Sequence, residues 1–246
     1  MDSLEKIKVE FERIKSLGFV RSNRINNKDG GIGNTFEDYL GVEENNLKDP
    51  DFEGFEIKTQ RQITSSYITL FSKSPTHPKG ANALLKERFG EVRDENFPDL
   101  KKLYASIFGD KWSEVYGKHL MKLNVDFDKE IIVLETKSAG QYYNEVYWDF
   151  EEIRKGLSKL NKLFVVSADQ KTIDNVQYYH YNKGVVFLEI DLDKFLEILS
   201  SGSIQFDIRI GVHKTGKNYG KPHDHGSGFR IKKDSLAQLY KHVIEL

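Results

Sequence analysis

Apolar residues recur along the chain at two spacings, and each spacing predicts a different kind of element. Between residues 3 and 17 they fall three or four apart, which places them on one face of a helix, and Gly18 follows as a helix cap. Further helices are expected at residues 35–45, 81–89 and 150–160, and from Asp191 or Asp193 to Leu199, before Gly202. The chain therefore contains several amphipathic helices.

Other segments alternate between apolar and polar residues, or are rich in β-branched and aromatic residues, as strands are. Strands are expected at residues 55–60, 67–73, 163–167, 178–181, 185–190 and 204–212, with a hairpin formed by residues 125–127 and 131–136. In segment 204–212 the apolar residues would point inward and leave Asp207 and Arg209 on one polar face. Helices interspersed with strands predict a mixed α/β (α+β) fold.

The segment 51–58 carries the clearest chemistry. Within its strand, Glu56 and Lys58 project from one face while Phe55 and Ile57 turn to the apolar side, and Asp51 lies just upstream. Two carboxylates can hold a hard divalent cation, and an adjacent ammonium can orient a water and offset charge on a phosphate. This trio predicts phosphodiester hydrolysis. The alternative is an amphipathic edge strand with solvated charges.

A further carboxylate lies upstream of this strand. Asn34 or Thr35 can cap a helix that holds Glu37 in its first turn, where the helix dipole favours a negative charge. From Glu37 to Glu56 there are eight acidic residues against the single Lys48, a density that is tolerable if solvated or partly neutralised by a cation. Glu37 is thus a candidate catalytic residue, or a residue that only supports its helix.

The segment 211–228 contains five Gly and three of the seven His, and is predicted to be a long β-hairpin loop. Arg209 and Arg230 on the flanking strands could each donate two hydrogen bonds to a guanine edge. The remaining candidates for DNA contact are base-reading His223, Asp224 and His225, and phosphate-binding Lys214, Lys217 and Lys221. Asp207 joins them on its strand.

Two alternatives remain open for this loop. The three lysines fit a solvated turn equally well. His223 and His225 could form a transition-metal site with His213 as a further ligand, although zinc requires three or four ligands and the chain contains no Cys.

Two other groups of residues are candidates for DNA binding. Lys73, His77 and Lys79 lie in a proline-bounded segment whose backbone could reach a groove, or which is only a surface loop. The aromatic residues Tyr142, Tyr143, Tyr147 and Trp148 could stack on bases, but such residues at strand-to-helix junctions more often belong to the core.

Charge and composition limit the choice of partner. The 246-residue chain has a net charge of −1, yet residues 208–233 carry seven Lys and Arg against Asp224 alone, a local excess of six positive charges that suits phosphates. The absence of Cys excludes disulfides and thiolate metal sites. With no signal-peptide core and no apolar run of membrane-spanning length, a soluble cytoplasmic protein is expected.

Taken together, several segments resemble the MvaI and BcnI restriction endonuclease family and its relative MutH. The resemblance is carried by residues 31–38, 50–52, 55–59, 69–76, 207–211, 223–226 and 229–231. By this resemblance, Glu37, Asp51, Glu56 and Lys58 fall on the catalytic positions of the family, and Asp51, Glu56 and the Ile57 carbonyl on its metal ligands. Residues 90–200 carry little motif-level resemblance.

The resemblance implies a PD-(D/E)xK nuclease core with a central mixed β-sheet flanked by helices, and two lobes around a DNA-binding cleft. Residues 1–120 would be mainly catalytic and residues 121–246 mainly DNA-reading, although the lobes could interleave. It implies one or two Mg²⁺ ions, double-stranded DNA as substrate, a pseudo-palindromic site such as CC(A/T)GG, and a monomer.

It also implies a prokaryotic cell that holds a cognate DNA methyltransferase. Two alternatives remain: a MutH-like mismatch-repair nickase that a partner protein activates, and a catalytically silent DNA-binding module.

Overall fold

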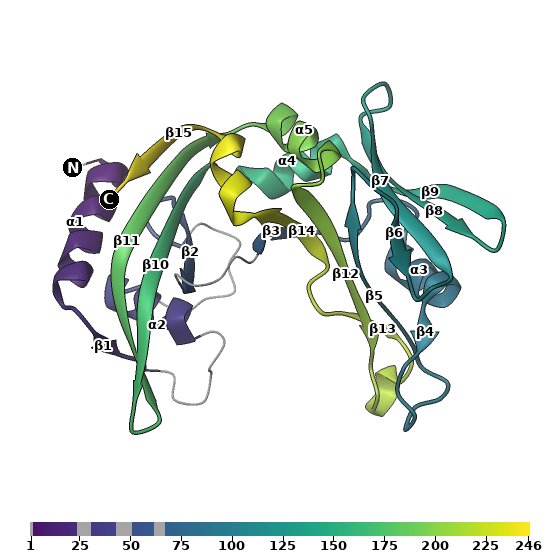
Figure 1. The fold of residues 1–246 in the computed structure, drawn as a ribbon, viewed down its shortest axis with the longest axis horizontal. Helices are drawn as coiled ribbons and strands as arrows, with labels where there is room; N and C mark the ends of the chain where they lie inside the picture. The colour runs from purple at the N-terminus through teal and green to yellow at the C-terminus, as the bar shows by residue number, and fades with distance from the viewer. Residues whose placement is uncertain (1, 24–30, 43–50, 62–66) are drawn as a thin grey trace. The chain divides into compact units, whose positions relative to one another are not determined.

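The computed structural model describes residues 2–23, 31–42, 51–61 and 67–246, and the chain divides into two compact units. The first unit combines Met1–Ser65, Ser158–Ile190 and Tyr240–Leu246, and the second combines Ser66–Leu157 and Asp191–Leu239 (Figure 1). The chain therefore leaves the first unit and returns to it twice. The two units are therefore interleaved along the chain. The assignment of residues 1–120 mainly to catalysis and of residues 121–246 mainly to DNA reading stays a prediction.

The described strands of the first unit form one mixed sheet. Their order is β1-β11-β10-β2, and β15 pairs with β11 beyond the short β1. β2 runs parallel to β10, whereas the other pairs are antiparallel. The elements are α1 (Ser3–Ser16), β1 (Val20–Arg21), α2 (Gly31–Leu40), β2 (Glu56–Arg61), β10 (Lys162–Ile173), β11 (Val176–Ile190) and β15 (Tyr240–Glu245).

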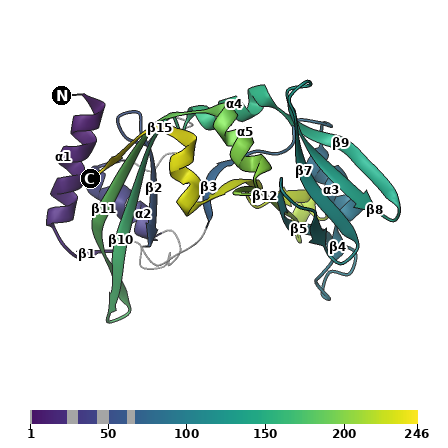
Figure 2. The same cartoon turned by 45° about the horizontal axis from the view of Figure 1, so that its top comes forward.

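Helices α1 and α2 cover one face of this sheet, and the core of the first unit lies beneath them (Figure 2). Phe164 of β10 is fully buried between Phe11 of α1 and Phe36 of α2, with ring centroids 5.5 Å and 6.2 Å away. The Tyr181 hydroxyl donates a hydrogen bond of 2.7 Å to the Ile32 carbonyl oxygen. This packing fixes which face of β2 is buried, and so which face remains for chemistry.

In its described part, the second unit contains two antiparallel sheets. One has the order β3-β14-β12-β5-β4, with β13 added to β12, and the other has the order β6-β7-β8-β9. The strands of the first of these sheets are β3 (Tyr67–Ser72), β4 (Glu91–Val92), β5 (Lys101–Phe108), β12 (Ile204–Val212), β13 (Pro222–Asp224) and β14 (Gly228–Lys232).

The other sheet and the helices complete this unit. They are β6 (Ser113–Val115), β7 (His119–Asp126), β8 (Ile131–Ser138), β9 (Gln141–Asp149), α3 (Ala81–Phe89), α4 (Phe150–Ser158), α5 (Leu192–Ser200), η1 (Gly216–Asn218) and η2 (Lys233–Leu239).

An aromatic cluster joins the two sheets of the second unit. Trp148 of β9 is fully buried, with its ring 4.6 Å from Phe206 of β12 and 5.5 Å from Phe229 of β14. Phe195 of α5 packs on Phe229 at 5.5 Å. Of the four aromatic residues near position 145, Trp148 is therefore a core residue, whereas Tyr142 is half exposed.

The mixed α/β fold expected from the pattern is confirmed, and most elements lie close to their predicted positions. Helix α3 has the predicted bounds, and Gly18 follows α1 with a φ of 67°. The helix expected from residue 35 begins earlier, at Gly31. The two segments predicted at 178–181 and 185–190 belong to the single strand β11, and β5 and β15 were not predicted.

Among the described residues, no helix combines the length and the apolar character needed to cross a membrane.

Replacing Phe164 with Ala should lower the free energy of unfolding by about 3–5 kcal/mol, because a fully buried aromatic ring is removed from between two others. Urea unfolding monitored by circular dichroism measures the change. Val9→Ala, at a half-exposed position of α1, is the matched control and should alter stability by less than about 0.5 kcal/mol. Equal effects of the two substitutions would contradict this account of the core.

Candidate functional site

Glu56 and Lys58 lie on one face of β2, as the strand period predicts. Phe55 and Ile57 turn to the other side and are buried, with exposed fractions of 1% and 6%. Lys58 Nζ lies 3.4 Å from Glu56 Oε1, and both side chains are about four-fifths buried. The pair therefore occupies a sheltered face of the sheet where opposite charges attract more strongly than in bulk water.

A tight turn brings Asp51 back to the start of this strand. Phe52 and Phe55 form an isolated antiparallel bridge with backbone hydrogen bonds of 3.1 Å and 2.7 Å. Between them, Glu53 and Gly54 both have positive φ, at 48° and 83°, which is the backbone of a type I′ turn. Asp51 Oδ2 then accepts a hydrogen bond of 2.8 Å from the Ile57 backbone N–H. The Asp51 carboxylate is thus held by the backbone of the residue that follows Glu56.

Pairing with β10 continues the polar face beyond Lys58. Glu56, Lys58 and Gln60 lie opposite Leu163, Val165 and Ser167 in the parallel register. Gln60 Nε2 donates a hydrogen bond of 3.3 Å to the largely buried Ser167 Oγ. The side chains that share a face with Lys58 are therefore held by a strand from a distant part of the sequence.

Glu37 lies on α2 and is partly buried. Because this helix begins at Gly31, Glu37 stands in its second turn, and the expectation of a first-turn position capped by Asn34 or Thr35 is wrong. The helix packs on β2: a Cβ added to Gly33 would come within 3.1 Å of Thr59 Oγ1, so this glycine permits the close approach.

The donor set on β2 suits a hard cation. Within the described ranges, no group of three or more His, Asp and Glu side chains is arranged to hold a metal ion. Asp51 and Glu56 are two oxygen ligands, and Mg²⁺ typically takes one or two carboxylates and fills its other positions with water or substrate oxygens. The residues present therefore fit magnesium, with the Ile57 carbonyl as a further oxygen.

In the second unit, Asp207 of β12 connects two arginines. It is 92% buried, whereas the strand pattern predicted an outward polar position, and that expectation is wrong because both faces of β12 are covered. Arg230 Nε lies 2.8 Å from Asp207 Oδ2 and forms an ion pair with it, but its N–H group makes no hydrogen bond. Arg209 Nη2 lies 3.5 Å from the same oxygen. Burial lowers the pKa of Arg230, and the charge of Asp207 opposes this shift.

The other oxygen of Asp207 is held by neutral donors. Ser106 Oγ of β5 donates a hydrogen bond of 2.7 Å to Oδ1, and Gln205 Nε2 donates one of 2.5 Å. Neither residue was singled out in the sequence. Gln205 shares the strand face of Asp207 and Arg209 by its spacing, whereas Ser106 lies on a strand that the pattern did not predict.

Asp224 shapes the loop between β13 and β14. Its Oδ1 accepts hydrogen bonds from the backbone N–H groups of Gly226 and Ser227, at 2.9 Å and 2.6 Å. Its Oδ2 accepts from Asn82 of α3 at 2.8 Å and lies 3.4 Å from the Ser74 hydroxyl. Both carboxylate oxygens therefore already have protein donors.

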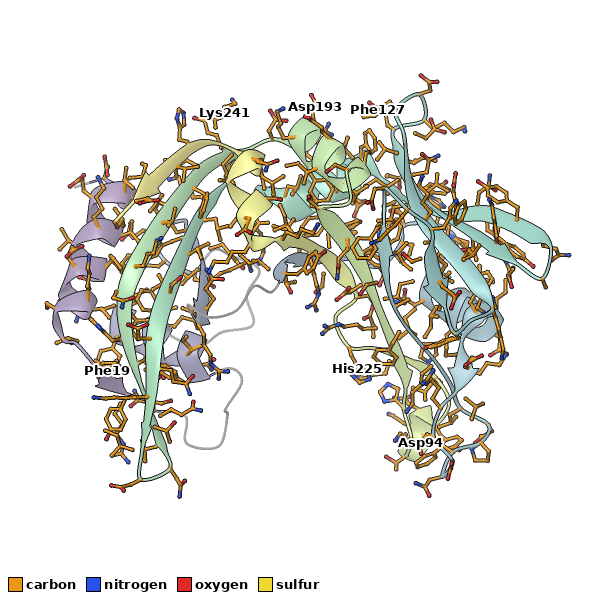
Figure 3. All side chains as sticks on the ribbon, viewed as in Figure 1. Phe19, Asp94, Phe127, Asp193, His225 and Lys241 are labelled. Atoms are coloured by element: carbon orange, nitrogen blue, oxygen red, sulfur yellow. The ribbon has the colours of Figure 1, made fainter. Side chains whose placement is uncertain are left out.

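Three histidine rings stand next to one another along this hairpin. The His223 ring lies 4.6 Å from that of His213 and 4.5 Å from that of His225, between centroids. Figure 3 labels His225, whose side chain is exposed. A Cβ on Gly211 would come within 2.5 Å of His225 Nε2, so a larger residue there would require this ring to shift. Among the described residues, these three rings do not form a group arranged to hold a metal ion.

The lysines of the hairpin differ in their partners. Lys214 Nζ lies 2.6 Å from Asp94 Oδ2, and this ion pair lowers the pKa of Asp94. Lys221 Nζ donates to Asn218 at 3.2 Å. Lys217 is exposed in η1, and no ion pair with another described residue engages it. Lys217 is thus the lysine whose charge is most available to a phosphate.

The residues predicted in the proline-bounded segment occupy the loop between β3 and α3. Lys73 pairs with Glu152 of α4, and the pKa of Glu152 falls to about 2 through its hydrogen bonds to Lys155 and Lys73. His77 stacks on Tyr147 with centroids 4.6 Å apart. Lys79 is exposed. Lys73 and His77 therefore hold this loop against α4 and β9.

Comparison with known proteins decides the family. The model of the MvaI/BcnI restriction endonuclease family matches residues 8–240. The chain belongs to this family. A solved structure entitled "Restriction endonuclease MvaI-cognate DNA substrate complex" is 33% identical, with a TM-score of 0.85, and the match covers 100% of this chain and 98% of that one. "Restriction endonuclease MvaI in the absence of DNA" is 34% identical, with a TM-score of 0.67 and the same coverage. No match was found among curated proteins.

The family resemblance found in the sequence is therefore confirmed. As a member of the MvaI/BcnI family, the chain is a restriction endonuclease that acts on DNA, a site-specific deoxyribonuclease. Enzymes of this kind generally use a divalent metal ion.

Replacing Asp207 with Asn should lower the free energy of unfolding by about 3–5 kcal/mol, because it removes one partner of a buried ion pair and leaves Arg230 uncompensated. Chemical unfolding measures the loss. The control is Glu87→Gln, since Glu87 is a 70% exposed partner of Lys101 and its loss should leave the stability nearly unchanged. A cost for Asp207→Asn as small as that of the control would show that Arg230 does not depend on Asp207.

Proposed function

We propose that this endonuclease cuts double-stranded DNA at a short pseudo-palindromic sequence in a Mg²⁺-dependent reaction that leaves a 5′-phosphate and a 3′-hydroxyl. The observation that carries the proposal is the hydrogen bond from the Ile57 N–H to Asp51, which holds a second carboxylate beside Glu56 and Lys58. Family membership and the similarity to a cognate-DNA complex of MvaI support a duplex substrate.

Asp51, Glu56 and the Ile57 carbonyl would hold one or two Mg²⁺ ions. When bound, the metal supplies positive charge to the reacting phosphate and lowers the pKa of a bound water. The turn at Glu53 and Gly54 presents the Asp51 carboxylate at low entropic cost, because its position is already fixed by the backbone. Glu37 would complete the outer coordination of the metal or hold Lys58.

Lys58 would orient the attacking water and offset the negative charge that grows on the phosphate in the transition state. Its ammonium lies 3.4 Å from Glu56, within reach of groups bound by the same carboxylate. The partial burial of the pair limits competing water and strengthens the interaction of the ammonium with a phosphate oxygen. In-line attack then breaks the bond to the 3′-oxygen.

Arg209 and Arg230 would read guanine edges, and Asp207 would align both guanidinium groups from one carboxylate oxygen. His223 and His225 would donate to base acceptors in the same groove. Asp224 would contribute chiefly by shaping the loop that carries these histidines, since both its oxygens have protein donors.

Lys214, Lys217 and Lys221 would contact phosphates, with Lys73, His77 and Lys79 as a second group of DNA-binding residues. Lys214 already forms an ion pair with Asp94, so Lys217 should contribute more to DNA affinity than Lys214. Phosphate contacts fix register and affinity, whereas base contacts fix specificity.

The cellular setting follows from the family. The enzyme would act in a prokaryotic cytoplasm beside a cognate DNA methyltransferase, and would recognise a site resembling CC(A/T)GG. It would work as a monomer that nicks the two strands in successive binding events.

Lys58→Ala should abolish cleavage of a sequenced plasmid in Mg²⁺ and leave specific DNA binding largely intact, because a transition-state ammonium contributes little to ground-state affinity. Cleavage is followed on gels with mapping of the ends. Asp51→Asn serves as the inactive control, and Lys159→Ala as the control for loss of a surface charge. Cleavage by Lys58→Ala within about tenfold of the parent rate would rule out this role.

Arg230→Ala and Lys217→Ala should affect DNA binding differently. The arginine variant should lose about 1–3 kcal/mol at one base position and relax specificity there, whereas the lysine variant should weaken all sequences alike and flatten the salt slope by about one unit. Affinities for cognate and single-mismatch duplexes across a salt series test both. If Arg230→Ala keeps full discrimination and only flattens the salt slope, Arg230 is a backbone contact.

A further inference from the structure

Tyr104 of β5 is an aromatic residue that the fold of the second unit leaves exposed. The residue is 44% exposed, whereas Leu103 and Ile107 of the same strand are fully buried. The Tyr104 backbone N–H donates a hydrogen bond of 2.8 Å to the Tyr116 hydroxyl. The Tyr104 hydroxyl itself makes no hydrogen bond to another residue in the described part of the chain. Tyr104 therefore presents to solvent a phenol group that the packing of the unit does not require.

The register of the sheet places this phenol on the face that carries Asp207 and Arg209. Tyr104 lies directly opposite Arg209 in the antiparallel pairing of β5 and β12, and Ser106 lies opposite Asp207. Residues paired in this way project from the same face, with Cβ atoms about 4.5–5.5 Å apart. Phe206 projects from the other face into the aromatic core. The phenol is thus a direct neighbour of an arginine that is proposed to read a base.

A glycine lets Tyr104 and His225 approach each other on this face. A Cβ added to Gly211 would lie 3.1 Å from the Tyr104 hydroxyl oxygen and 2.5 Å from His225 Nε2. The two rings stack with centroids 6.3 Å apart and planes inclined by 25°. The His225 backbone N–H also donates a hydrogen bond of 2.9 Å to the Arg209 carbonyl oxygen. Arg209, Tyr104 and His225 therefore form one continuous surface.

The phenol adds a hydrogen-bond acceptor to a surface that is rich in donors. An arginine side chain only donates hydrogen bonds. Asp207 is 92% buried, and both carboxylate oxygens of Asp224 already have protein donors. Burial raises the pKa of Tyr104, so the phenol is uncharged at neutral pH, and its oxygen can accept while its hydrogen can donate.

A guanine–cytosine pair requires both kinds of partner in the major groove. Guanine presents two acceptors, O6 and N7, and cytosine presents the amino group on C4 as a donor. A guanidinium group can satisfy the guanine edge, but it offers nothing to the cytosine amino group. An acceptor beside the arginine completes the recognition of the pair.

We propose that Tyr104 is a further specificity-determining residue, whose hydroxyl accepts a hydrogen bond from the amino group of the cytosine paired with the guanine that Arg209 reads. The inference rests on the proposed function, in which Arg209 contacts a guanine edge. The hydroxyl would contact the base directly, since it is exposed beside Arg209 and has no other described partner.

The test combines Tyr104→Phe, which removes only the oxygen, with pyrimidin-2-one, a cytosine analogue that lacks the amino group. The probe is a duplex that carries the site mapped from cleaved plasmid. Its affinity is measured by fluorescence anisotropy with Ca²⁺ in place of Mg²⁺, because Ca²⁺ takes the same oxygen ligands and is expected to support binding without cleavage. Mismatched duplexes first identify the base pair at which Arg209→Ala loses discrimination, and the analogue then replaces the cytosine of that pair.

The parent enzyme should bind the analogue duplex about five- to tenfold more weakly than the unmodified duplex, the effect of losing one hydrogen bond. Tyr104→Phe should bind both duplexes equally, with the reduced affinity that the parent shows for the analogue. Equal losses on the analogue duplex for the parent and for Tyr104→Phe would overturn the inference. A parent that binds both duplexes with the same affinity would also overturn it.

Phe127→Ala is the control for loss of an exposed aromatic surface in the same unit. Phe127 is 62% exposed between β7 and β8, and Figure 3 shows it far from His225. This variant should keep the affinities of the parent for both duplexes. The melting temperature of Tyr104→Phe should equal that of the parent, since the hydroxyl it removes has no described partner.

Arg209→Ala separates the inference from the proposed function. If Arg209→Ala relaxes specificity at one base pair and Tyr104→Phe is not coupled to the analogue there, only the role of Tyr104 fails. If Arg209→Ala keeps full discrimination at every position, Arg209 does not read a base, and the inference fails together with that part of the proposed function.

Discussion

The hydrogen bond from the Ile57 backbone to the Asp51 carboxylate joins the core of the first unit to its chemistry. Ile57 is buried under α1 and α2, so its N–H is fixed by the packing of the sheet. The carboxylate that accepts this hydrogen bond is therefore fixed as well, although it belongs to an exposed residue outside the strand. The Asp51 side chain is thus held in one position by a neighbouring strand, although Asp51 itself lies outside that strand.

In the second unit, ion pairs hold polar side chains in place. Asp207 holds two arginines on one oxygen and is itself held by Ser106 and Gln205 on the other. A buried carboxylate in this position costs desolvation, which two cations and two neutral donors offset. Both guanidinium groups are thereby kept close to one carboxylate oxygen, from where they would meet a base edge under the proposed function.

The sequence predicts a structural feature well when neighbouring residues determine it, and poorly when distant segments do. The face shared by Glu56 and Lys58 follows from the two-residue period of a strand and was predicted correctly. The α3 bounds and the capping glycine after α1 are local in the same sense. The burial of Asp207 was missed because it depends on β5, whose pattern gave no strand signal, and on the Ser106 donor, which is 101 residues away in the sequence. Strand β15 was not predicted either, since in the structure it is recognised by its pairing with β11.

The interleaving of the two units has a consequence for the order of synthesis. The sheet that carries Lys58 is completed by β10 and β11 and then by β15, which contains some of the last residues of the chain. A nascent polypeptide of about a hundred residues contains all the side chains proposed to be catalytic, but it lacks β10, the strand that pairs with β2. The alignment of this strand face therefore depends on contacts between distant segments of the chain, and contacts of such sequence separation form late in folding.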